Sequence, residues 1–480
     1  MMKDKLFMLA FVLILALALP LAALAAGGPD GNPPQGMGEA PQGMGERPEG
    51  MGEPPQGMGE RPEGMGEPPQ GGMPGGGSAD FEYAAANTID GAAVETDGTY
   101  ESFTADESAV MIDTDADVTL ENPTVLKTGD SDGGDNGNFY GLNAAVLVKG
   151  GANATIVGGT VTTNADGANG VFSYGGNGGH NGAEGDGTTV TISDTVITTT
   201  GDGSGGIMTT GGGVTYANNL TVETSGRSSA AIRTDRGGGT VVVDGGSYTS
   251  NGLGSPAIYS TADITVSNAT LTSNLSEGVC IEGKNSITLN DCDMTASNTS
   301  RNGHAQFLDT IMIYQSMSGD ADSGTSAFTM NGGSLTSLSG HMFHVTNNNA
   351  VITLNGVALT NADAENVLLS VCADGWSGAG NIATLNAANQ VLTGTILVGS
   401  DSQLTLNLTE GSSFEGAISG SIVNAEGDTV STEMGDVTVT LDAASTWTLT
   451  ADTSISAFEG DLANVNANGY ALYVNGEQVL

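Results

Sequence analysis

Basic residues and aromatic side chains are scarce in this 480-residue chain. Lys and Arg number 11 against 55 Asp and Glu, which gives a formal charge of −44, and aromatics make up 5% of the residues. A polyanion without a Lys/Arg run repels phosphate groups, so nucleic acid and anionic lipid are excluded as partners. So few aromatics, together with 75 glycines, argue against a helical protein or a conventional large-cored enzyme. The composition favours an all-β chain with many tight turns.

Cysteine is nearly absent as well. The chain contains only Cys280, Cys292 and Cys372, an odd number with no CxxC spacing. Neither a zinc site nor a disulfide framework is therefore expected. We expect the three thiols to pack as small apolar side chains, so stability has to come from the fold itself.

The N-terminus has the pattern of a secretory signal peptide. Lys3 and Lys5 precede a long apolar run that ends in a small-residue segment near Ala25. We therefore expect residues 1–25 to be removed and the protein to be secreted or held at the cell surface, without stable membrane insertion. The apolar stretch is also just long enough to span a bilayer, so an uncleaved N-terminal anchor is the alternative.

Residues 26–78 have the composition of a linker. From Pro34 onward a seven-residue unit, Pro-(Gln/Glu)-Gly-Met-Gly-Glu-X, is repeated. Each unit holds one proline and two glycines, which break helices, and a single apolar residue, so this heptad does not predict a coiled coil. We interpret the segment as a flexible, partly polyproline-like spacer.

Beyond residue 78 a short block recurs along the chain. It consists of an apolar anchor, a turn-tolerant Gly, Asn or Asp at plus two, an apolar residue at plus five and threonine at plus six. An eighth, weaker block places Thr215, Leu220 and Thr221 at the anchor, plus-five and plus-six positions. The seven clear anchors are Ile156, Ile192, Val243, Val266, Leu289, Met330 and Leu354. Their threonines are Thr162, Thr198, Thr249, Thr272, Thr295, Thr336 and Thr360.

A third apolar position follows six of the seven anchors at plus fifteen. Successive anchors lie 23 or 24 residues apart in several steps, and no helix pattern interrupts them. A unit of this length with three short strands closes one coil of a parallel β-helix, whereas β-sandwich strands would not keep one offset from block to block. We therefore predict an all-β, single-stranded parallel β-helix, with its core over 79–381 and its last coils and cap over 382–480. The plus-fifteen residues are Val171, Ile207, Ile258, Ile281, Val345 and Leu369.

Several stretches of this region resemble bacterial exported adhesin-like proteins of the pectin-lyase-like superfamily. They are GLNAA at 141–145, TDRGGG at 234–239, GSPAIYST at 254–261 and MIYQSMSGD at 312–320. The resemblance covers roughly 80–480 and implies a right-handed β-helix and a surface location. Members of that group largely lack an assigned reaction, so the resemblance implies no catalytic residue.

Outward residues near the third strand form a candidate ligand-binding face. Side chains alternate along a strand, so an inward Ile258 places Tyr259 outside, and the same rule applies to each coil. The stripe combines basic, acidic and aromatic groups, which could bind an anionic ligand or stack on sugar rings. Neutralisation of stacked carboxylates and a stabilising tyrosine ladder are the structural alternatives. The candidates are Arg233, Asp235, Arg236, Tyr259, Glu282, Lys284, Tyr314, Gln315 and His344.

Calcium is the cofactor that the sequence favours. Asp130, Asp132 and Asp135 lie in a glycine-rich loop whose oxygens suit a hard cation, although a solvated acidic loop is an equal alternative. His341 and His344 have HxxH spacing. Because residues three apart on a strand face opposite sides, we do not expect them to bind one metal together.

These patterns predict a monomeric, adhesin-like module that binds polysaccharide or another surface polymer. A stacked sheet offers a repeating groove to a repeating ligand. A polysaccharide lyase or glycoside hydrolase acting on acidic glycans is one alternative, with an arginine as base, or with Asp235 and either Asp309 or Asp320 as acid and base. No motif of either class stands out, so catalysis is not the expected function. A structural surface or matrix component is the other alternative.

Overall fold

The computed structural model describes residues 82–131, 136–178, 184–316, 318–378 and 380–480. All of them belong to one compact unit, Gly71–Leu480. The expected signal peptide, the linker, and Asp132 and Asp135 of the expected calcium loop lie outside the described residues. Within the described ranges, no helix is long and apolar enough to cross a membrane.

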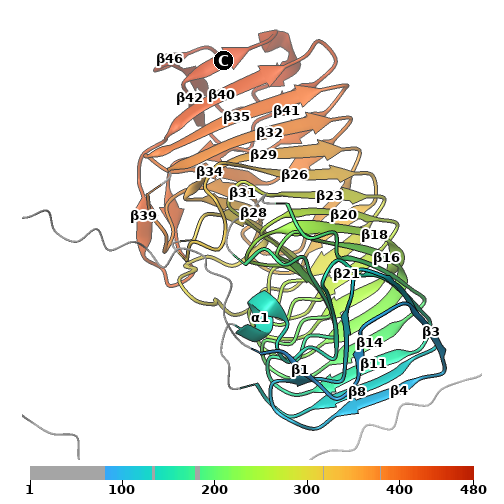
Figure 1. Ribbon diagram of the computed structural model, residues 1–480. Coiled ribbons are helices and arrows are strands. Elements are labelled where there is room, and N and C mark those ends of the chain that lie inside the picture. The colour runs from blue at the N-terminus through green and yellow to red at the C-terminus, as the bar shows by residue number, and fades with distance from the viewer. Residues whose placement is uncertain (1–81, 132–135, 179–183, 317, 379) are drawn as a thin grey trace, which may run out of the picture. The chain divides into compact units, whose positions relative to one another are not determined.

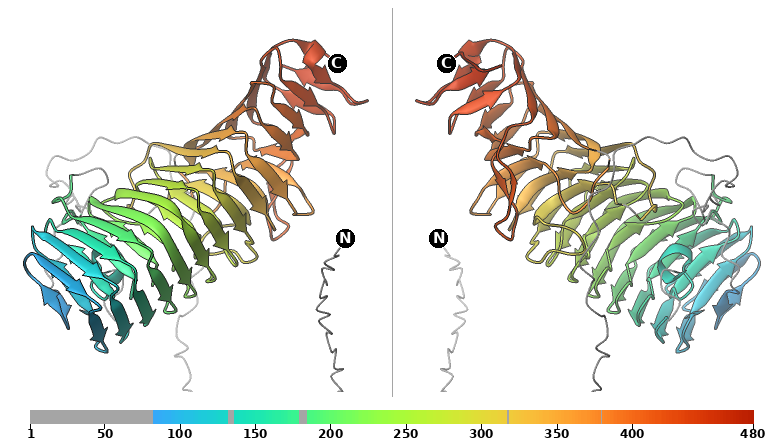
Figure 2. Two further views of the ribbon diagram at one scale, coloured as in Figure 1. Left: turned by 90° about the vertical axis from the view of Figure 1, so that its right-hand side faces the viewer. Right: turned by 90° about the vertical axis from the view of Figure 1, so that its left-hand side faces the viewer.

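Parallel β-sheet dominates this unit. A 22-stranded and a 13-stranded sheet contain most of the strands, and successive coils stack in parallel as rungs (Figures 1 and 2). The described residues contain one α-helix, α1 (Asn136–Tyr140), and one 3-10 turn, Leu462–Asn464. The chain is thus all-β with long parallel sheets, an arrangement consistent with the predicted parallel β-helix.

The 13-stranded sheet takes one strand from each coil. Its members, in spatial order, are β2 (Thr88–Ile89), β6 (Val110–Asp113), β9 (Val146–Lys149), β12 (Val171–Tyr174), β15 (Ile207–Thr210), β17 (Ile232–Thr234), β19 (Ile258–Ser260), β22 (Val279–Glu282), β25 (Asp309–Tyr314), β28 (His341–Thr346), β31 (Val367–Val371), β34 (Thr395–Val398) and β37 (Ile418–Ser419).

The 22-stranded sheet takes two strands, or one long strand, from most coils. Its members are β3 (Ala93–Thr96), β4 (Thr99–Ser102), β7 (Asp117–Glu121), β8 (Thr124–Thr128), β10 (Asn153–Val157), β11 (Thr160–Asn164), β13 (Thr189–Ser193), β14 (Val196–Thr199), β16 (Gly213–Thr224), β18 (Gly239–Ser250), β20 (Asp263–Ser267), β21 (Thr270–Ser273), β23 (Ser286–Asn290), β24 (Asp293–Ala296), β26 (Thr325–Asn331), β27 (Ser334–Ser337), β29 (Asn348–Asn355), β30 (Ala358–Asn361), β32 (Asn381–Ala388), β35 (Ser402–Thr409), β40 (Asp436–Leu441) and β43 (Ala457–Glu459).

Smaller sheets complete the C-terminal part. One has four strands, β33 (Val391–Thr393), β36 (Ser413–Glu415), β41 (Thr446–Thr448) and β44 (Val465–Asn466). Another joins β42 (Thr453–Ile455), β45 (Leu472–Val474) and β46 (Glu477–Gln478). The β45–β46 pair is antiparallel, so the chain turns back on itself at this end instead of adding a further parallel strand.

The predicted anchors form one buried ladder inside the stack. Val266 pairs with Val243 on one side and with Leu289 on the other, and the remaining anchors continue the same register. All seven are fully buried and belong to one core cluster. Their threonines are likewise stacked, as Thr272 pairs with both Thr249 and Thr295 on the outer side of the sheet. Burial of the anchor face therefore fixes the register of the coils.

The plus-two residues turn the corner between two strands of the 22-stranded sheet. Their φ angles lie between 50° and 72°, the left-handed region that glycine tolerates and that Asn and Asp adopt more readily than other residues. This conformational demand explains why only three residue types occupy the position. The corner residues are Gly158, Asp194, Gly245, Asn268, Asp291, Gly332 and Gly356.

Two details of the predicted register are wrong. In the weak eighth block, Ala217 rather than Thr215 is the anchor, since it pairs with Ile192 and Val243, and Val222 rather than Leu220 takes the plus-five place. On the third strand, Val279 and Phe343 continue the ladder of Ile258, whereas the predicted Ile281 and Val345 lie two residues farther along. Both errors are shifts of two residues, which keep every side chain on its predicted face.

Candidate functional site

Two apolar clusters cover separate parts of the outer face of the 13-stranded sheet. Toward the N-terminal coils, Phe139 and Tyr140 of α1 pack on outward residues that include Phe172. Toward the C-terminal coils, Phe307, Cys372 and Ile422 form a second small cluster. Figure 1 shows α1 lying over one part of this face and β39 (Thr429–Ser431) over another. The cleft described below lies on β19, β22 and β25, between these covers.

The cleft consists of two adjoining cavities of about 230 Å³ and 240 Å³. Tyr259 and Tyr314, predicted to lie on the same outward face, line both of them, together with Gly254, Pro256 and Asn302. Glu277 and Trp376 line the first cavity, and Arg233 lines the second. The cleft thus combines three aromatic side chains with charged and amide groups.

Glu282 is the buried acceptor at the centre of this face. The hydroxyls of Tyr259 and Tyr314 donate to its Oε2 at 2.5 Å and 3.2 Å, and Ser316 and Ser318 donate to its Oε1. Only 1% of Glu282 is exposed. Burial is the main cause that raises the pKa of both tyrosines well above the ordinary value, so both hydroxyls keep their protons and donate. The structure therefore brings together the predicted residues Tyr259, Glu282 and Tyr314.

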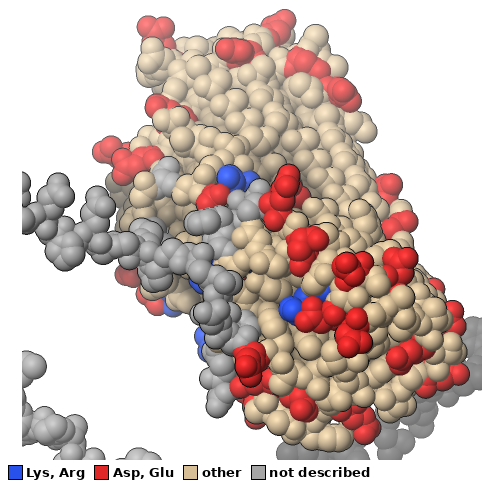
Figure 3. Space-filling view, in the orientation of Figure 1, with Lys and Arg blue, Asp and Glu red and all other residues tan. Residues whose placement is uncertain are grey.

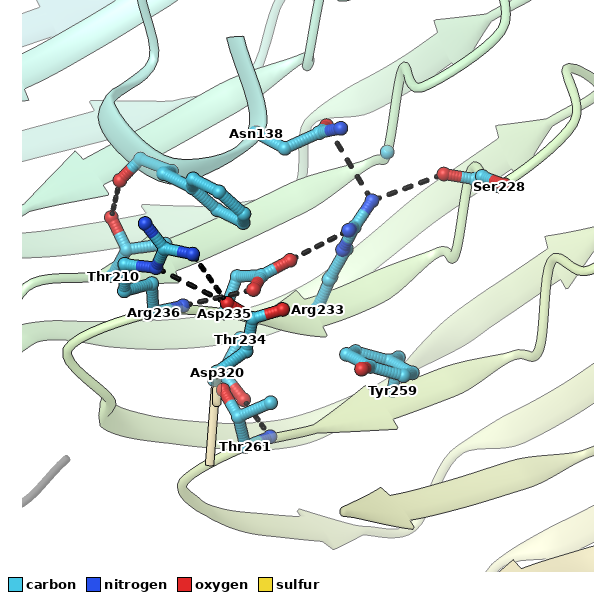
Figure 4. Close-up of polar contacts among 12 residues, drawn as sticks. Asn138, Thr210, Ser228, Arg233, Thr234, Asp235, Arg236, Tyr259, Thr261 and Asp320 are labelled. Carbon is cyan, nitrogen blue, oxygen red and sulfur yellow. Dashed lines mark hydrogen bonds and ion pairs between the residues drawn. The ribbon is translucent and has the colours of Figure 1, made fainter. Parts of the chain in front are cut away.

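Arg233 is held by groups of the chain itself. It forms an ion pair of 2.6 Å with Asp235, donates to the carbonyl of Ser228 at 3.0 Å, and lies 5.5 Å from the ring centre of Tyr259 (Figure 4). Burial raises the pKa of Asp235 to about 6, and the charge of Asp320 adds to this, although Arg233 acts in the opposite direction. The contacts of Arg233 agree with the structural alternative, in which arginine neutralises a carboxylate.

Arg236 is similarly engaged. Its Nη2 and Nε lie 2.7 Å and 3.1 Å from Oδ1 of Asp320, and its guanidinium lies 4.1 Å from the ring centre of Phe139 in α1. Figure 4 shows Arg236 and Arg233 on either side of Asp235. Each of the two arginines already has a carboxylate partner. Binding of an anionic ligand by these arginines stays a prediction.

The other three candidates do not line the cleft. Lys284 forms a 2.9 Å ion pair with Asp322, both side chains being nearly half exposed. Gln315 is buried and donates to the carbonyls of Ser316 and Ala321, so it holds its own loop. His344 is fully buried, as the next paragraph describes.

His341 and His344 lie on the same side of their strand, and the expectation of opposite faces is wrong. The intervening Met342 and Phe343 both belong to the hydrophobic core, which displaces the alternation by one residue. As a result, the Nδ1 atoms of both histidines lie 2.7 Å from Oγ of Ser370. His344 Nε2 also lies 3.2 Å from Asp374.

The same corner recurs on the preceding coils and carries a ladder of buried ionisable residues. Asp309 pairs with His341, and Glu277 precedes Gly278, whose amide donates to the carbonyl of Thr310. Asp309 is fully buried, and neither of its carboxyl oxygens has a hydrogen-bond partner among the described residues. Burial, then the charges of Glu277 and Asp374, raises the pKa of Asp309 well above its ordinary value.

The expected calcium site has only one described carboxylate. Oδ1 of Asp130 accepts the amide of Asp166 at 3.0 Å, and Asp166 and Asp202 repeat this contact on the next coils. This is a ladder that holds turns together. In the ranges that the structure describes, no group of three His, Cys, Asp or Glu side chains could hold a metal ion, so calcium stays a prediction. The three cysteines are buried and free, as expected.

The sequence analysis missed Glu277, Asn302 and Trp376, and it considered Asp309 only as a partner of Asp235. All four lie outside the recurring block, near its corners or in segments inserted between blocks. The long interval between the anchors Leu289 and Met330 was the one available signal, since an interruption of a regular repeat marks an inserted loop.

Acidic side chains are spread over much of the surface in Figure 3, and basic ones are few.

In comparisons with protein-family models, curated proteins and solved structures, the chain has no match, so the chemistry of the cleft has to be inferred from its own residues.

Proposed function

We propose that the protein is an exported, right-handed parallel β-helix of the pectin-lyase-like kind, which binds polysaccharide or another surface polymer in this cleft. The observation that carries the proposal is the convergence of Tyr259, Tyr314 and Trp376 on one cleft. Aromatic rings offer flat, rigid apolar faces to sugar rings at little loss of conformational entropy.

The aromatic groups are held in place. The rings of Tyr314 and Trp376 lie 4.9 Å apart at an angle of 54°, and the hydroxyl of Tyr314 is fixed by Glu282. Asn302 and the carboxylate of Glu277 supply polar groups at the edge of the first cavity, where sugar hydroxyls need partners. Since neighbouring coils repeat about every 4.8 Å, the cleft suits a chain of linked units better than an isolated small molecule.

Retention on insoluble polysaccharides tests this proposal. Trp376→Ala should weaken binding about tenfold or more, which corresponds to about 1.4 kcal/mol. The matched control is Tyr216→Ala, because Tyr216 is 44% exposed on the outer face of the 22-stranded sheet, away from the cleft. The proposal fails if no polymer in a broad panel retains the wild-type protein, or if both variants bind as the wild type does.

Hydrolysis of the bound chain is the second candidate function. It is favoured by Asp309, whose pKa is raised by burial and by the charge of Glu277, as glycoside hydrolysis needs an acid beside a carboxylate. The same retention assay separates the two functions, because release of reducing ends from the polymer accompanies hydrolysis only.

A further inference from the structure

We infer that the cleft receives a positively charged group, and that the bound polymer carries amino sugars with free amines. The inference rests on the proposed carbohydrate binding and adds the charge of the ligand to it. It comes from three observations on the first cavity: among the described residues the carboxyl groups in and beside it form no ion pair, nearby cationic side chains bind other groups, and its walls are aromatic.

The carboxyl groups come first. Glu277 is 7% exposed and lines the cavity, Glu282 is 1% exposed and lies under the two tyrosines, and Asp309 is fully buried behind them. Among the described residues, none of the three forms an ion pair. A carboxylate removed from water without a counter-charge is costly unless it stays protonated or a cation is supplied. The pKa of Asp309 is raised, which favours its protonated, uncharged form.

Glu282 and Glu277 differ in how they are satisfied. Glu282 accepts four hydroxyl groups, which stabilise a negative charge without neutralising it. Within the described ranges, Glu277 accepts only the hydroxyl of Ser276. Glu277 is therefore the carboxylate that has both the access and the unused acceptor capacity to bind a cation from outside.

Most of the nearby cationic side chains are held by other groups. Four of them lie against carboxylates outside the first cavity, and Arg227 donates to Oδ1 of Asn302 at 3.0 Å, so none forms an ion pair with Glu277 among the described residues. His304 also lines this cavity, but its ring packs against Trp376 at 6.2 Å and forms no ion pair within the described part of the chain. The pairs are Arg233–Asp235, Arg236–Asp320, Lys284–Asp322 and Arg301–Glu426.

The aromatic walls suit the same ligand. An ammonium group is attracted to the faces of Trp and Tyr rings, most strongly to Trp, and Trp376 and Tyr314 both line the cavity with Glu277. A cavity of about 230 Å³ lies below the usual range for larger ligands, so it fits a single ring of a chain. A free amine on that ring would meet both a carboxylate and an aromatic face. An acetylated amine lacks the charge, and a uronate would be repelled.

Calorimetric titration of the full secreted chain with defined oligosaccharides tests the inference. The probes are oligomers of glucosamine, N-acetylglucosamine, glucose and galacturonate, of equal length and at one ionic strength. We expect the glucosamine oligomer to bind at least tenfold more tightly than the other three. Glu277→Gln should remove this preference while leaving the weaker binding of the glucose oligomer intact.

The chain is strongly acidic, so non-specific attraction of any polyamine needs a control. Glu415→Gln removes one exposed charge on β36, far from the cleft residues in the sequence, and should keep the full preference. Equal weakening by Glu277→Gln and Glu415→Gln would overturn the inference, as would equal binding of the glucose and glucosamine oligomers. Equal binding of the glucose and glucosamine oligomers would leave the proposed polymer binding intact. The proposed function itself would be contradicted if no oligomer and no polymer bound. If Glu277→Gln does not fold, Trp376→Ala should reduce the tenfold preference through the lost ring.

Discussion

The two large sheets belong to the same coils but differ on their outer faces. On the 22-stranded sheet, strands such as β21 and β24 alternate between buried and accessible residues. On the 13-stranded sheet, β12, β22 and β28 are buried at every position. One outer face is bare and repeats from coil to coil, while the other is covered by segments that leave the repeat.

This difference separates the part of the chain that builds the scaffold from the part that builds the site. The bare face needs only stacked threonines and other small polar residues, which each coil can supply in the same way. The covered face gathers Tyr259, Tyr314, Trp376 and Glu277 from different coils and from inserted segments. Substitutions on the two faces should therefore have unequal effects.

The largest expected difference is between two outward aromatic residues. Phe172 on β12 is fully buried beneath α1, so Phe172→Ala should lower the free energy of unfolding by about 3–5 kcal/mol. Tyr216 on β16 faces outward from the other sheet and is largely accessible, so Tyr216→Ala should change it by about 0.5 kcal/mol or less. Chemical denaturation measures both. Equal losses would mean that the segment over β12 does not shield that face.

An intermediate effect is expected for two glycines with similar backbones. Gly333 (φ 68°) turns a corner of the 22-stranded sheet, and a Cβ there would overlap the carbonyl oxygen of Cys292. Gly303 (φ 58°) lies in a segment beside the cleft, and a Cβ there would meet no atom within 4 Å.

Gly303→Ala should therefore cost about 1–2 kcal/mol, from the left-handed backbone alone. Gly333→Ala should cost clearly more, because the coil beneath it has to shift. Thermal unfolding of both variants measures the difference. If the Gly303 variant is as unstable as the Gly333 variant, the corner at Gly333 is not more tightly packed than the segment at Gly303.

The last expected effect grows with pH and concerns Asp309. Its pKa is raised in the folded protein, so the folded state holds a proton to higher pH than the unfolded state does. Stability therefore falls as pH rises above about 3.9, the unfolded value, by up to about 1.4 kcal/mol per pH unit until the folded group ionises. Asp309→Asn removes this slope, so the variant should gain stability relative to the wild type from pH 4 upward.

Urea denaturation at several pH values measures this gain. Asp293→Asn is the control, because Asp293 is exposed on the outer face of the 22-stranded sheet and should follow the wild-type curve closely. If the Asp309 variant also runs parallel to the wild type, the buried carboxyl group does not retain its proton.

The sequence predicted the scaffold well because each part of the repeat has a local physical cause. Leu289 is apolar since it is buried on every side, and Asn268 is an asparagine at a left-handed corner. The prediction that Tyr259 and Tyr314 share one outward face followed from strand alternation alone. These relations hold within one coil and its neighbours, so they can be inferred from spacing.

The rest of the site could not be predicted, because it depends on corners whose width varies and on inserted segments. Two consecutive inward residues, Met342 and Phe343, placed His341 on an unexpected side. Trp376 reaches Tyr314 from a segment whose path no periodicity specifies. Spacing alone did not decide whether Arg233 binds a ligand or neutralises a carboxylate, and the structure pairs it with Asp235, a residue only two positions away.

The asparagines along one corner indicate how such a protein can change. Asn331 donates to Asn290, which lies 41 residues earlier, and Asn290 donates to Ser267, only 23 residues earlier. The longer excursion leaves the contact unaltered, because each rung touches only the rungs above and below it. Loops over the cleft can therefore be lengthened, shortened or exchanged one at a time during evolution, while the framework that carries them stays the same.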